Sequence, residues 1–486
     1  MKSEEIDGVK IGLECHAQLL TRTKLFCRCP TNYQNSEPNT HVCETCLGLP
    51  GALPVVNGQA LRYGIKVALA LGCAIQPETI FYRKNYYYPD LPRGFQITQY
   101  DFPIALKGLV SIESPENGGA KEREIRITRV HMEEDPGRLA YKGTIDTAKY
   151  SLVDYNRSGM PLVEIVTEPD LKSPKEARIF LGKLRSILGY LGVFEGDREG
   201  AMRVDANISV AGGQRAEVKN ISSYKGVERA LAFEITRQKN LVRRGLVVTQ
   251  ETRHFDEVRG VTISMRTKEF EHDYRYFPEP DLVPLHISGL VEELKREIPE
   301  LPDEKRTRFA TQYSITQEHA TALTYDITIA DFYEEVASKI DSKLSAVWIA
   351  DVLKGELNYR SISMREASER ISTDEFVSIL RYLTKSVITE RGATEIVREM
   401  LDHGGTPDEI IKDKGLASIG SGDIEKAVSE VLEANKSAVE DYRAGKNEAL
   451  NFIVGQVMKQ TRGRAEPKEV REFVRARIDR SVEGQS

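Results

Sequence analysis

The stretch Val9-Lys-Ile-Gly-Leu-Glu-Cys-His-Ala-Gln-Leu19 gives the clearest strand pattern of the chain. Side chains of a strand point alternately to its two faces, and every odd position here is apolar. The even positions place Glu14, His16 and Gln18 together on the opposite face. Because a polar strand face is usually only solvated, this stretch alone predicts a half-buried strand and no site.

A second stretch, Met202–Val210, repeats the pattern with Asp205 and Asn207 on its polar face. Asp and Asn are poor strand formers, so a pair of them at alternate positions indicates a local rule broken for function. Glu217 and Lys219 share one face of the strand expected next. Because polar strand faces with acidic residues recur in these separate stretches, we interpret them as a candidate site and not as solvated surface.

Further acids lie between these two stretches. Glu164 interrupts the apolar run Pro161–Val166, and a carboxylate there is costly to bury without a partner or a metal. Glu133 and Glu134 belong to a crowded acidic run, which oxygen-preferring Mg²⁺ would stabilise. We therefore expect one divalent site, with a surface acidic turn as the alternative. Its predicted ligands are Glu14, His16, Glu133, Glu134 and Glu164.

Four cysteines form two close pairs, Cys27 with Cys29 and Cys43 with Cys46. Six cysteines in 486 residues are too few for a disulfide scaffold, so metal is the better interpretation in a reducing compartment. Two pairs at this separation favour a structural Zn²⁺ over free thiols, although Cys-x-Cys is tighter than the usual spacing. Four thiolates would close the coordination shell.

Basic and aromatic residues alternate in Tyr82–Asp90 and again in Asp273–Pro280. Arg and Lys can hold phosphate and Tyr can stack on a base, although tyrosine-rich strands are also common in β cores. The sequence contains no Gly-x4-Gly-Lys-Ser/Thr loop, so any ATP chemistry does not use a P-loop. No serine or cysteine nucleophile motif is evident.

The overall pattern predicts an α+β chain of about three domains. The first 290 residues read as strands with a few helices, two of them beginning at Ser173 and near Ser223. A helical region then extends to about Ile410, and the remainder over 422–480 reads as three short helices. No apolar run approaches the 18 or so residues of a membrane span, and no signal peptide is evident, so a cytoplasmic location is expected.

The net charge is −6, which excludes a global nucleic-acid signature. From Lys459 to Arg480, however, eight basic residues face only four acids. Such a patch can hold phosphates, although composition alone favours a solvated helix face with ion pairs inside the helix.

Several stretches, in the same order, resemble the B subunits of the aspartyl/glutamyl-tRNA amidotransferases, and the resemblance extends over nearly the whole chain. They are Ile11–Gln18, Leu47–Pro54, Arg83–Pro92, His131–Asp135, Val153–Arg157, Glu164–Asp170, Asp205–Asn207 and Asp273–Asp281.

The resemblance implies an ATP-dependent carbon–nitrogen ligase with glutamine as nitrogen donor. Such a protein phosphorylates the side-chain carboxylate of Glu-tRNA(Gln) or Asp-tRNA(Asn), using ATP and Mg²⁺, and ammonia then displaces the phosphate. The implied partners are the misacylated tRNA and the two other members of a heterotrimer, an amidase (the A subunit) and a small C subunit.

The resemblance also implies a β-sheet cradle with flanking helices over 1–293, with a zinc-binding insert at 27–46. An all-helical domain over 294–412 and a small helical tail over 413–486, which contacts tRNA, would follow. The implied catalytic residues are Glu14, His16, Glu134 and Glu164. Those expected at ATP or the aminoacyl end are Arg83, Lys84, Asp205, Asn207, Glu217 and Lys219.

Two alternatives remain open. A non-catalytic tRNA-binding adaptor of the same complex would tolerate substitution of His16 and Glu134 but not of the tail. A carboxylate–metal hydrolase would turn over its substrate without ATP or a partner.

Overall fold

The computed structural model describes residues 8–116, 119–141, 148–196, 200–267 and 274–483. Residue contacts divide the chain into two compact units, Met1–Pro302 and Asp303–Ser486. The first combines a large sheet with helices and the second is helical, which confirms the α+β class.

The main sheet of the first unit has twelve strands, and among its pairs only β12 and β13 run parallel in the described residues. From one edge to the other its order is β14 (Val261–Thr267), β13 (Glu251–Asp256), β12 (Ala216–Ile221), β11 (Met202–Ser209), β1 (Lys10–Gln18), β10 (Pro161–Thr167), β7 (Gly119–Glu134), β5 (Phe95–Gln99), β4 (Phe81–Asn85) and β15 (Phe277–Pro278). Two further strands are β6 (Ala105–Glu116), which pairs with β7, and β2 (Ala74–Ile75), which pairs with β6. Separate two-stranded ribbons are β3 (Glu78–Thr79) with β16 (Leu285–His286) and β8 (Arg138–Tyr141) with β9 (Ser151–Asp154).

The apolar face of β1 packs into the core of this unit. Ile11, Leu13 and Cys15 are fully buried, as their odd positions predict. They share one hydrophobic cluster with side chains of α2 (Gly58–Ala70), α3 (Pro174–Tyr190) and α4 (Tyr224–Arg243). The same alternation leaves the even residues of β1 on the other face of the sheet.

Helix α3 begins where the sequence predicts. Ser173 is its N-cap and accepts a hydrogen bond from the amide of Glu176, and Pro174 occupies the first turn. In a reciprocal capping box the Glu176 carboxylate would accept from the amide of Ser173. It accepts instead from the amide of Lys172 at 2.6 Å. The second expected helix is α4, capped by Ser223.

The second unit is built from helices, with a π-helical turn at Trp348–Leu353. Its helices are α6 (Pro302–Gln312), α7 (Gln317–Thr324), α8 (Ile327–Ala337), α9 (Ser342–Val347), α10 (Lys354–Arg360), α11 (Met364–Ala367), α12 (Thr373–Thr384), α13 (Glu390–His403), α14 (Pro407–Lys414), α15 (Ser421–Ala434), α16 (Lys436–Arg443), α17 (Asn447–Gln460) and α18 (Pro467–Glu483). No helix in the described ranges combines the length and apolar character that a membrane crossing needs.

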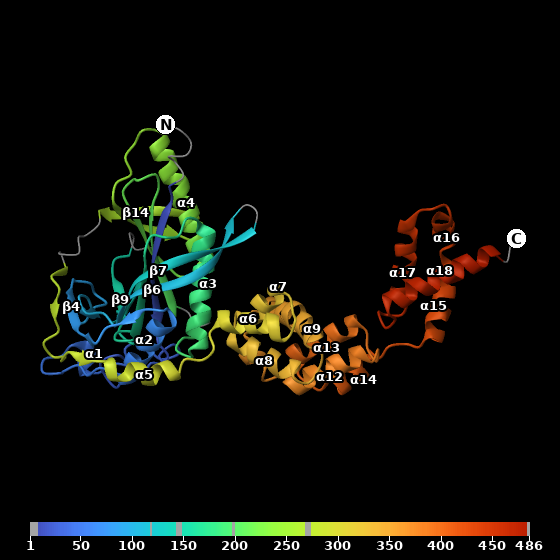
Figure 1. Cartoon of the computed structure of the whole chain (residues 1–486), viewed down its shortest axis with the longest axis horizontal. Helices are drawn as coiled ribbons and strands as arrows, with labels where there is room; N and C mark the ends of the chain where they lie inside the picture. Colours follow the sequence, from blue (N-terminus) through green and yellow to red (C-terminus); the bar gives the residue numbers. More distant parts are fainter. Residues whose placement is uncertain (1–7, 117–118, 142–147, 197–199, 268–273, 484–486) are drawn as a thin grey trace. The chain divides into compact units, whose positions relative to one another are not determined.

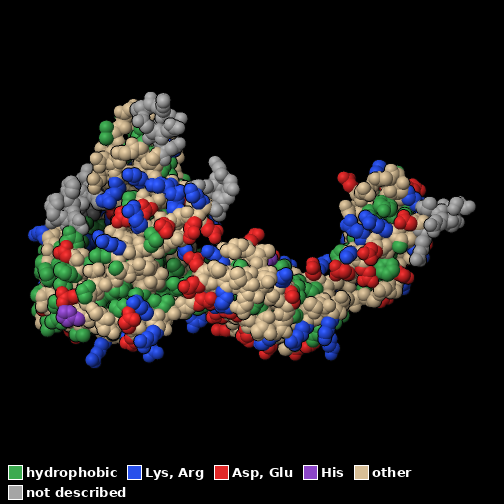
Figure 2. Space-filling model, viewed as in Figure 1, with side chains coloured by type: hydrophobic (Ala, Val, Ile, Leu, Met, Phe, Trp, Pro, Cys, Tyr) green, Lys and Arg blue, Asp and Glu red, His purple; other side chains and the backbone are tan. Residues whose placement is uncertain are grey.

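The tail region contains four helices, so the prediction of three was wrong. Helices α15, α17 and α18 enclose a core that includes Val428, Ile453 and Val474. The additional helix, α16, has no fully buried residue and only packs Ala438, Val439 and Tyr442 against this core, so its apolar stripe is short and weak as a sequence signal. Basic and acidic side chains are both visible on this region in Figure 2.

The contact division differs from the predicted domain limits. The limit at residue 293 falls inside α5 (Ser288–Arg296), whose Leu294 is fully buried in the core of the first unit. The limit at 412 falls inside α14. The contacts group the helical and tail regions in one unit, and their separation into two domains stays a prediction.

We predict that Leu13→Ala lowers the free energy of unfolding by about 2–5 kcal/mol, because it leaves a cavity in the closed core. The matched change on the exposed end of the same strand, Lys10→Ala, should shift it by less than about 0.5 kcal/mol. Urea unfolding of both variants measures the difference. Equal effects would contradict the assignment of the two faces of β1.

Candidate active site

Antiparallel register aligns the polar residues of four strands into rows on one face of the sheet. Glu14 of β1 lies opposite Asp205 of β11. The next row crosses β11, β1, β10 and β7 and consists of Arg203, His16, Glu164 and His131. Directly paired residues of antiparallel strands have side chains on the same face, so residues far apart in sequence become neighbours.

This face lines a cavity of about 230 Å³. The predicted residues in its lining are Glu14, His16, Lys84, Glu133, Glu164, Asp205 and Lys219. The sequence prediction missed Gln96, Thr98, Gln99, Arg129, His131, Arg203 and Tyr276, which also line it. The alternation of side chains along β7 could have predicted Arg129 and His131, because both lie on the same strand face as Glu133.

His16, Glu133 and Glu164 form the centre of the cavity wall. His16 Nε2 lies 3.5 Å from Glu133 Oε1 and 3.3 Å from Glu164 Oε2. On the other side, His131 Nε2 lies 2.9 Å from Glu164 Oε2. One ligand atom each from His16, Glu133 and Glu164 falls within 4.8 Å of the others, a spacing that can hold a metal ion.

The charges of this group shift one another's protonation. Burial alone would lower the pKa of His16, but the negative charges of Glu164 and Glu133 raise it to about 9. Burial would raise the pKa of Glu164, yet His131 and His16 bring it well below its usual range. The group therefore holds a carboxylate in its charged form, ready for a cation.

A second acidic group lies one row away. Glu14, Asp205 and Glu217 also bring ligand atoms within 4.8 Å. Lys219 Nζ lies 3.0 Å from Glu217 Oε1 and 3.3 Å from Asp205 Oδ2, and Asn207 Nδ2 donates to Glu14 Oε1 at 2.8 Å. Burial and the neighbouring carboxylates raise the pKa of Glu14. The five predicted metal ligands are thus not one cluster, since Glu14 belongs to this second group.

Glu134 lies on the opposite face of the sheet, so its prediction as a ligand in the same cluster was wrong. It directly follows Glu133 on β7, and consecutive strand residues point to opposite faces. Its carboxylate pairs with Arg93 and accepts a hydrogen bond from the amide of Ile97 at 2.9 Å. The following acid, Asp135, accepts from Gln18 Nε2 at 2.8 Å. Separate partners therefore resolve the crowding of the three acids.

Arg83 and Lys84 are also consecutive strand residues, on β4, and their side chains point to opposite faces of the sheet. Lys84 lines the cavity, with Nζ 4.8 Å from the ring centroid of Tyr274. Arg83 instead donates two hydrogen bonds of 2.7 Å to the almost completely buried Glu279 and does not line this cavity. The expected contact of Arg83 with ATP or the aminoacyl end is not supported by this position.

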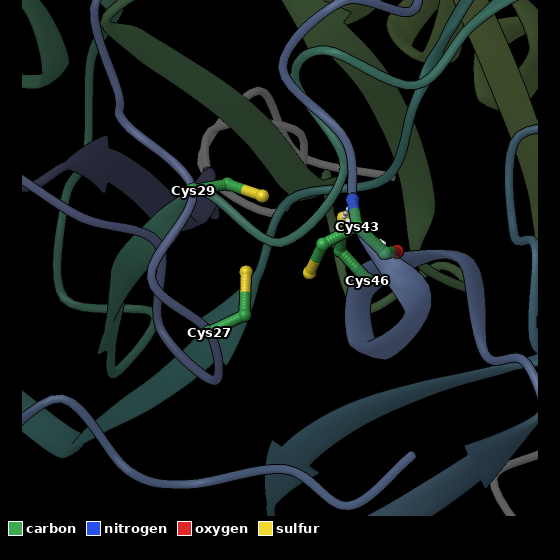
Figure 3. Close-up of side chains that lie close together, drawn as sticks. All are labelled: Cys27, Cys29, Cys43 and Cys46. Carbon is green, nitrogen blue, oxygen red and sulfur yellow. Dashed lines mark hydrogen bonds between the residues drawn. The ribbon is translucent and has the colours of Figure 1, made fainter. Parts of the chain in front are cut away.

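The four cysteines of the predicted insert come together, and Figure 3 shows their sulfur atoms turned toward one another. All four Sγ atoms lie within 4.8 Å. Cys43 caps α1 (Glu44–Leu47), and its amide donates to Cys46 Sγ at 3.1 Å. A hydrogen bond from Cys27 and the nearby Lys24 ammonium together lower the pKa of Cys46 to about 5, although burial opposes them. This donor set fits a closed tetrahedral metal site.

Comparison with known families places this fold and site in a defined class. The GatB/GatE catalytic domain matches residues 9–292, which include the cavity and the cysteine cluster. A second family, the GatB domain, matches residues 331–478 in the helical unit. The chain therefore has the catalytic domain and the helical domain of a GatB-type protein.

Relatives that match over nearly their whole length specify the family. A protein of Methanococcoides burtonii is 57% identical over 98% of this chain and 100% of its own. Proteins of Methanosarcina mazei and Haloquadratum walsbyi are 54% and 49% identical, over 98% and 96% of this chain and 99% and 97% of their own. Each is named as the B subunit of an aspartyl/glutamyl-tRNA(Asn/Gln) amidotransferase, and this chain belongs to that family.

We predict that the purified chain contains one zinc ion and that Cys43→Ser loses it, because three thiolates leave the shell open. Elemental analysis by mass spectrometry measures the metal. Cys73→Ala is the matched control, since Cys73 is a buried cysteine outside the cluster. Zinc retained at the wild-type level in Cys43→Ser would contradict the prediction.

Proposed function

We propose that this chain activates the side-chain carboxylate of Glu-tRNA(Gln) or Asp-tRNA(Asn) with ATP and converts it to the amide. The observation that carries the proposal is a cavity lined by carboxylates, imidazoles and cations in a member of the amidotransferase B-subunit family. The names of its relatives support this substrate class.

The chemistry explains why a cavity of this kind is needed. A carboxylate is a poor acyl donor, because its leaving group would be oxide. In the first step a carboxylate oxygen attacks the γ-phosphorus of ATP and the bond to ADP breaks, giving an acyl phosphate. In the second step ammonia attacks the acyl carbon, the bond to phosphate breaks, and the nitrogen loses a proton. The products are the amide, ADP and inorganic phosphate.

His16, Glu133 and Glu164 are the residues that we assign to Mg²⁺, on the basis of their spacing and charge. When bound, Mg²⁺ would neutralise negative charge on the phosphoryl group during its transfer. His131 holds the Glu164 carboxylate from the other side and fixes its position.

The remaining predicted residues receive separate roles. Lys84 and Lys219 line the cavity and are assigned to phosphate or to the aminoacyl end. Asp205 and Glu217 orient Lys219, and Asn207 orients Glu14. Arg83 and Glu134 are assigned to holding β4 and β7 to neighbouring loop segments through their ion pairs with Glu279 and Arg93.

The proposed complex needs partners that the chain does not contain. Ammonia would come from the amidase (the A subunit), and the small C subunit would complete a cytoplasmic heterotrimer. We assign the tail to tRNA binding, since Lys459–Arg480 carries an excess of basic residues. The four-cysteine cluster is assigned to structural zinc.

The main alternative remains an adaptor that only binds tRNA. The internal ion pairs of the cavity would then be structural, and substitutions there would leave activity unchanged. A metal-dependent hydrolase is the third possibility, and it would need neither ATP nor a partner.

We predict that this chain, with its partner proteins and Mg²⁺, releases ADP from ATP when Glu-tRNA(Gln) or Asp-tRNA(Asn) is present. The carboxylate must be in place before phosphoryl transfer, so tRNA carrying glutamine or asparagine should give no ADP above background. A coupled ADP assay measures this. ADP release that ignores the attached amino acid would contradict the proposal, and tRNA binding without any ADP would favour the adaptor.

A second prediction separates neighbouring acids. Glu133→Gln should weaken Mn²⁺ binding and slow ADP release about 100-fold, because the metal-binding set of His16, Glu133 and Glu164 loses a charged ligand. Electron paramagnetic resonance measures the Mn²⁺ binding. Glu134→Gln should leave Mn²⁺ binding near the wild-type value. It should instead lower stability by about 3 kcal/mol, since the largely buried Arg93 loses its partner. Equal loss of Mn²⁺ binding in both variants would overturn the assignment.

A further inference from the structure

Arg129 is a cation of the cavity that the proposed mechanism has not used. It lies on β7 with Glu133 and His131, on the same face and spaced by two residues. It is partly buried, and its paired residues across the sheet are Val166 and Leu106, which offer it no charge.

The other cations of the cavity have partners. Arg203 pairs with Asp135 at 2.5 Å, and Lys219 pairs with two carboxylates. Lys84 lies against the ring of Tyr274. Among the residues that the structure describes, none forms a hydrogen bond or ion pair with the Arg129 side chain. Its guanidinium is therefore available to a ligand.

A second unsatisfied group lies beside it. His131 is 3% exposed, and its Nδ1 atom is buried with no hydrogen-bond partner, whereas its Nε2 contacts Glu164. A buried polar atom without a partner costs free energy unless a ligand or water completes it. Two unsatisfied groups on one strand face, in the wall of the cavity, indicate a ligand position beside His16, Glu133 and Glu164.

We propose that Arg129 binds an oxyanion of the substrate, either the nucleotide phosphate or the side-chain carboxylate that receives it. The inference rests on the proposed function and adds a contact to it. The planar guanidinium can donate two parallel hydrogen bonds to either anion, which a lysine cannot do. Arg129 is one row, about 7 Å along the strand, from the row that contains Glu164, so one anion can contact both Arg129 and the metal group.

The test uses the complete complex with Arg129→Gln and Arg129→Lys. Arg126→Gln is the matched control, because Arg126 lies on the same strand but is 63% exposed and paired with Asp170. The measurements are the KM for ATP, the KM for Glu-tRNA(Gln), and the Kd of Mg²⁺-ADP by calorimetry. Arg129→Gln should raise a KM or the Kd about 10- to 100-fold, and Arg129→Lys should raise it less.

Arg129→Gln should keep the wild-type urea midpoint, because its loss leaves no carboxylate unpaired. A rise in the KM for ATP and in the Kd of ADP assigns Arg129 to the nucleotide phosphate. A rise in the KM for the aminoacyl-tRNA alone assigns it to the side-chain carboxylate. If wild type releases ADP and Arg129→Gln matches Arg126→Gln in all three constants, the inference is overturned. If wild type releases no ADP, the proposed function fails, and an ADP Kd that is unchanged by Arg129→Gln then overturns this inference as well.

Discussion

The antiparallel register of β1 with β10 and β11 is the constraint on which the candidate site depends. It places His16 opposite Glu164 on one side and opposite Arg203 on the other. A slip of one residue would move Glu14 and His16 into the hydrophobic core and expose Leu13 and Cys15. Because α2, α3 and α4 pack on the apolar face, the core itself fixes this register. The packing of the core therefore also determines which polar side chains meet in the site.

Charge balance is the second organising feature. The cavity holds several carboxylates at close range, which is costly unless cations neutralise them. His16 does so for Glu164, and Lys219 does so for Asp205 and Glu217. Such preorganised pairs can exchange a protein cation for a metal ion or a ligand without building a new pocket. This property suits a reaction that gathers phosphate, carboxylate and metal at one place.

The sequence predicted what depends on local pattern and missed what depends on tertiary pairing. Alternation in β1, the Ser173 cap of α3 and the clustering of the four cysteines all followed from residue types and spacing. The error at Glu134 arose because the acidic run leads into a Pro-Gly turn, so the sequence did not show that β7 extends as far as Glu134. Its partner Arg93 lies on a separate segment that no local pattern connects to it. The helix α16 was missed because it is short and its apolar side chains are only partly buried.

The central claim is that this chain makes an acyl phosphate, and trapping that species tests it most directly. The complex would receive ATP, Mg²⁺ and Glu-tRNA(Gln) without glutamine or ammonia, and hydroxylamine would be added as the nucleophile. The account predicts a γ-glutamyl hydroxamate on the tRNA, formed only with ATP and lost in Glu133→Gln. Amide formation with ammonia but no hydroxamate under matched conditions would contradict an acyl phosphate made in this cavity.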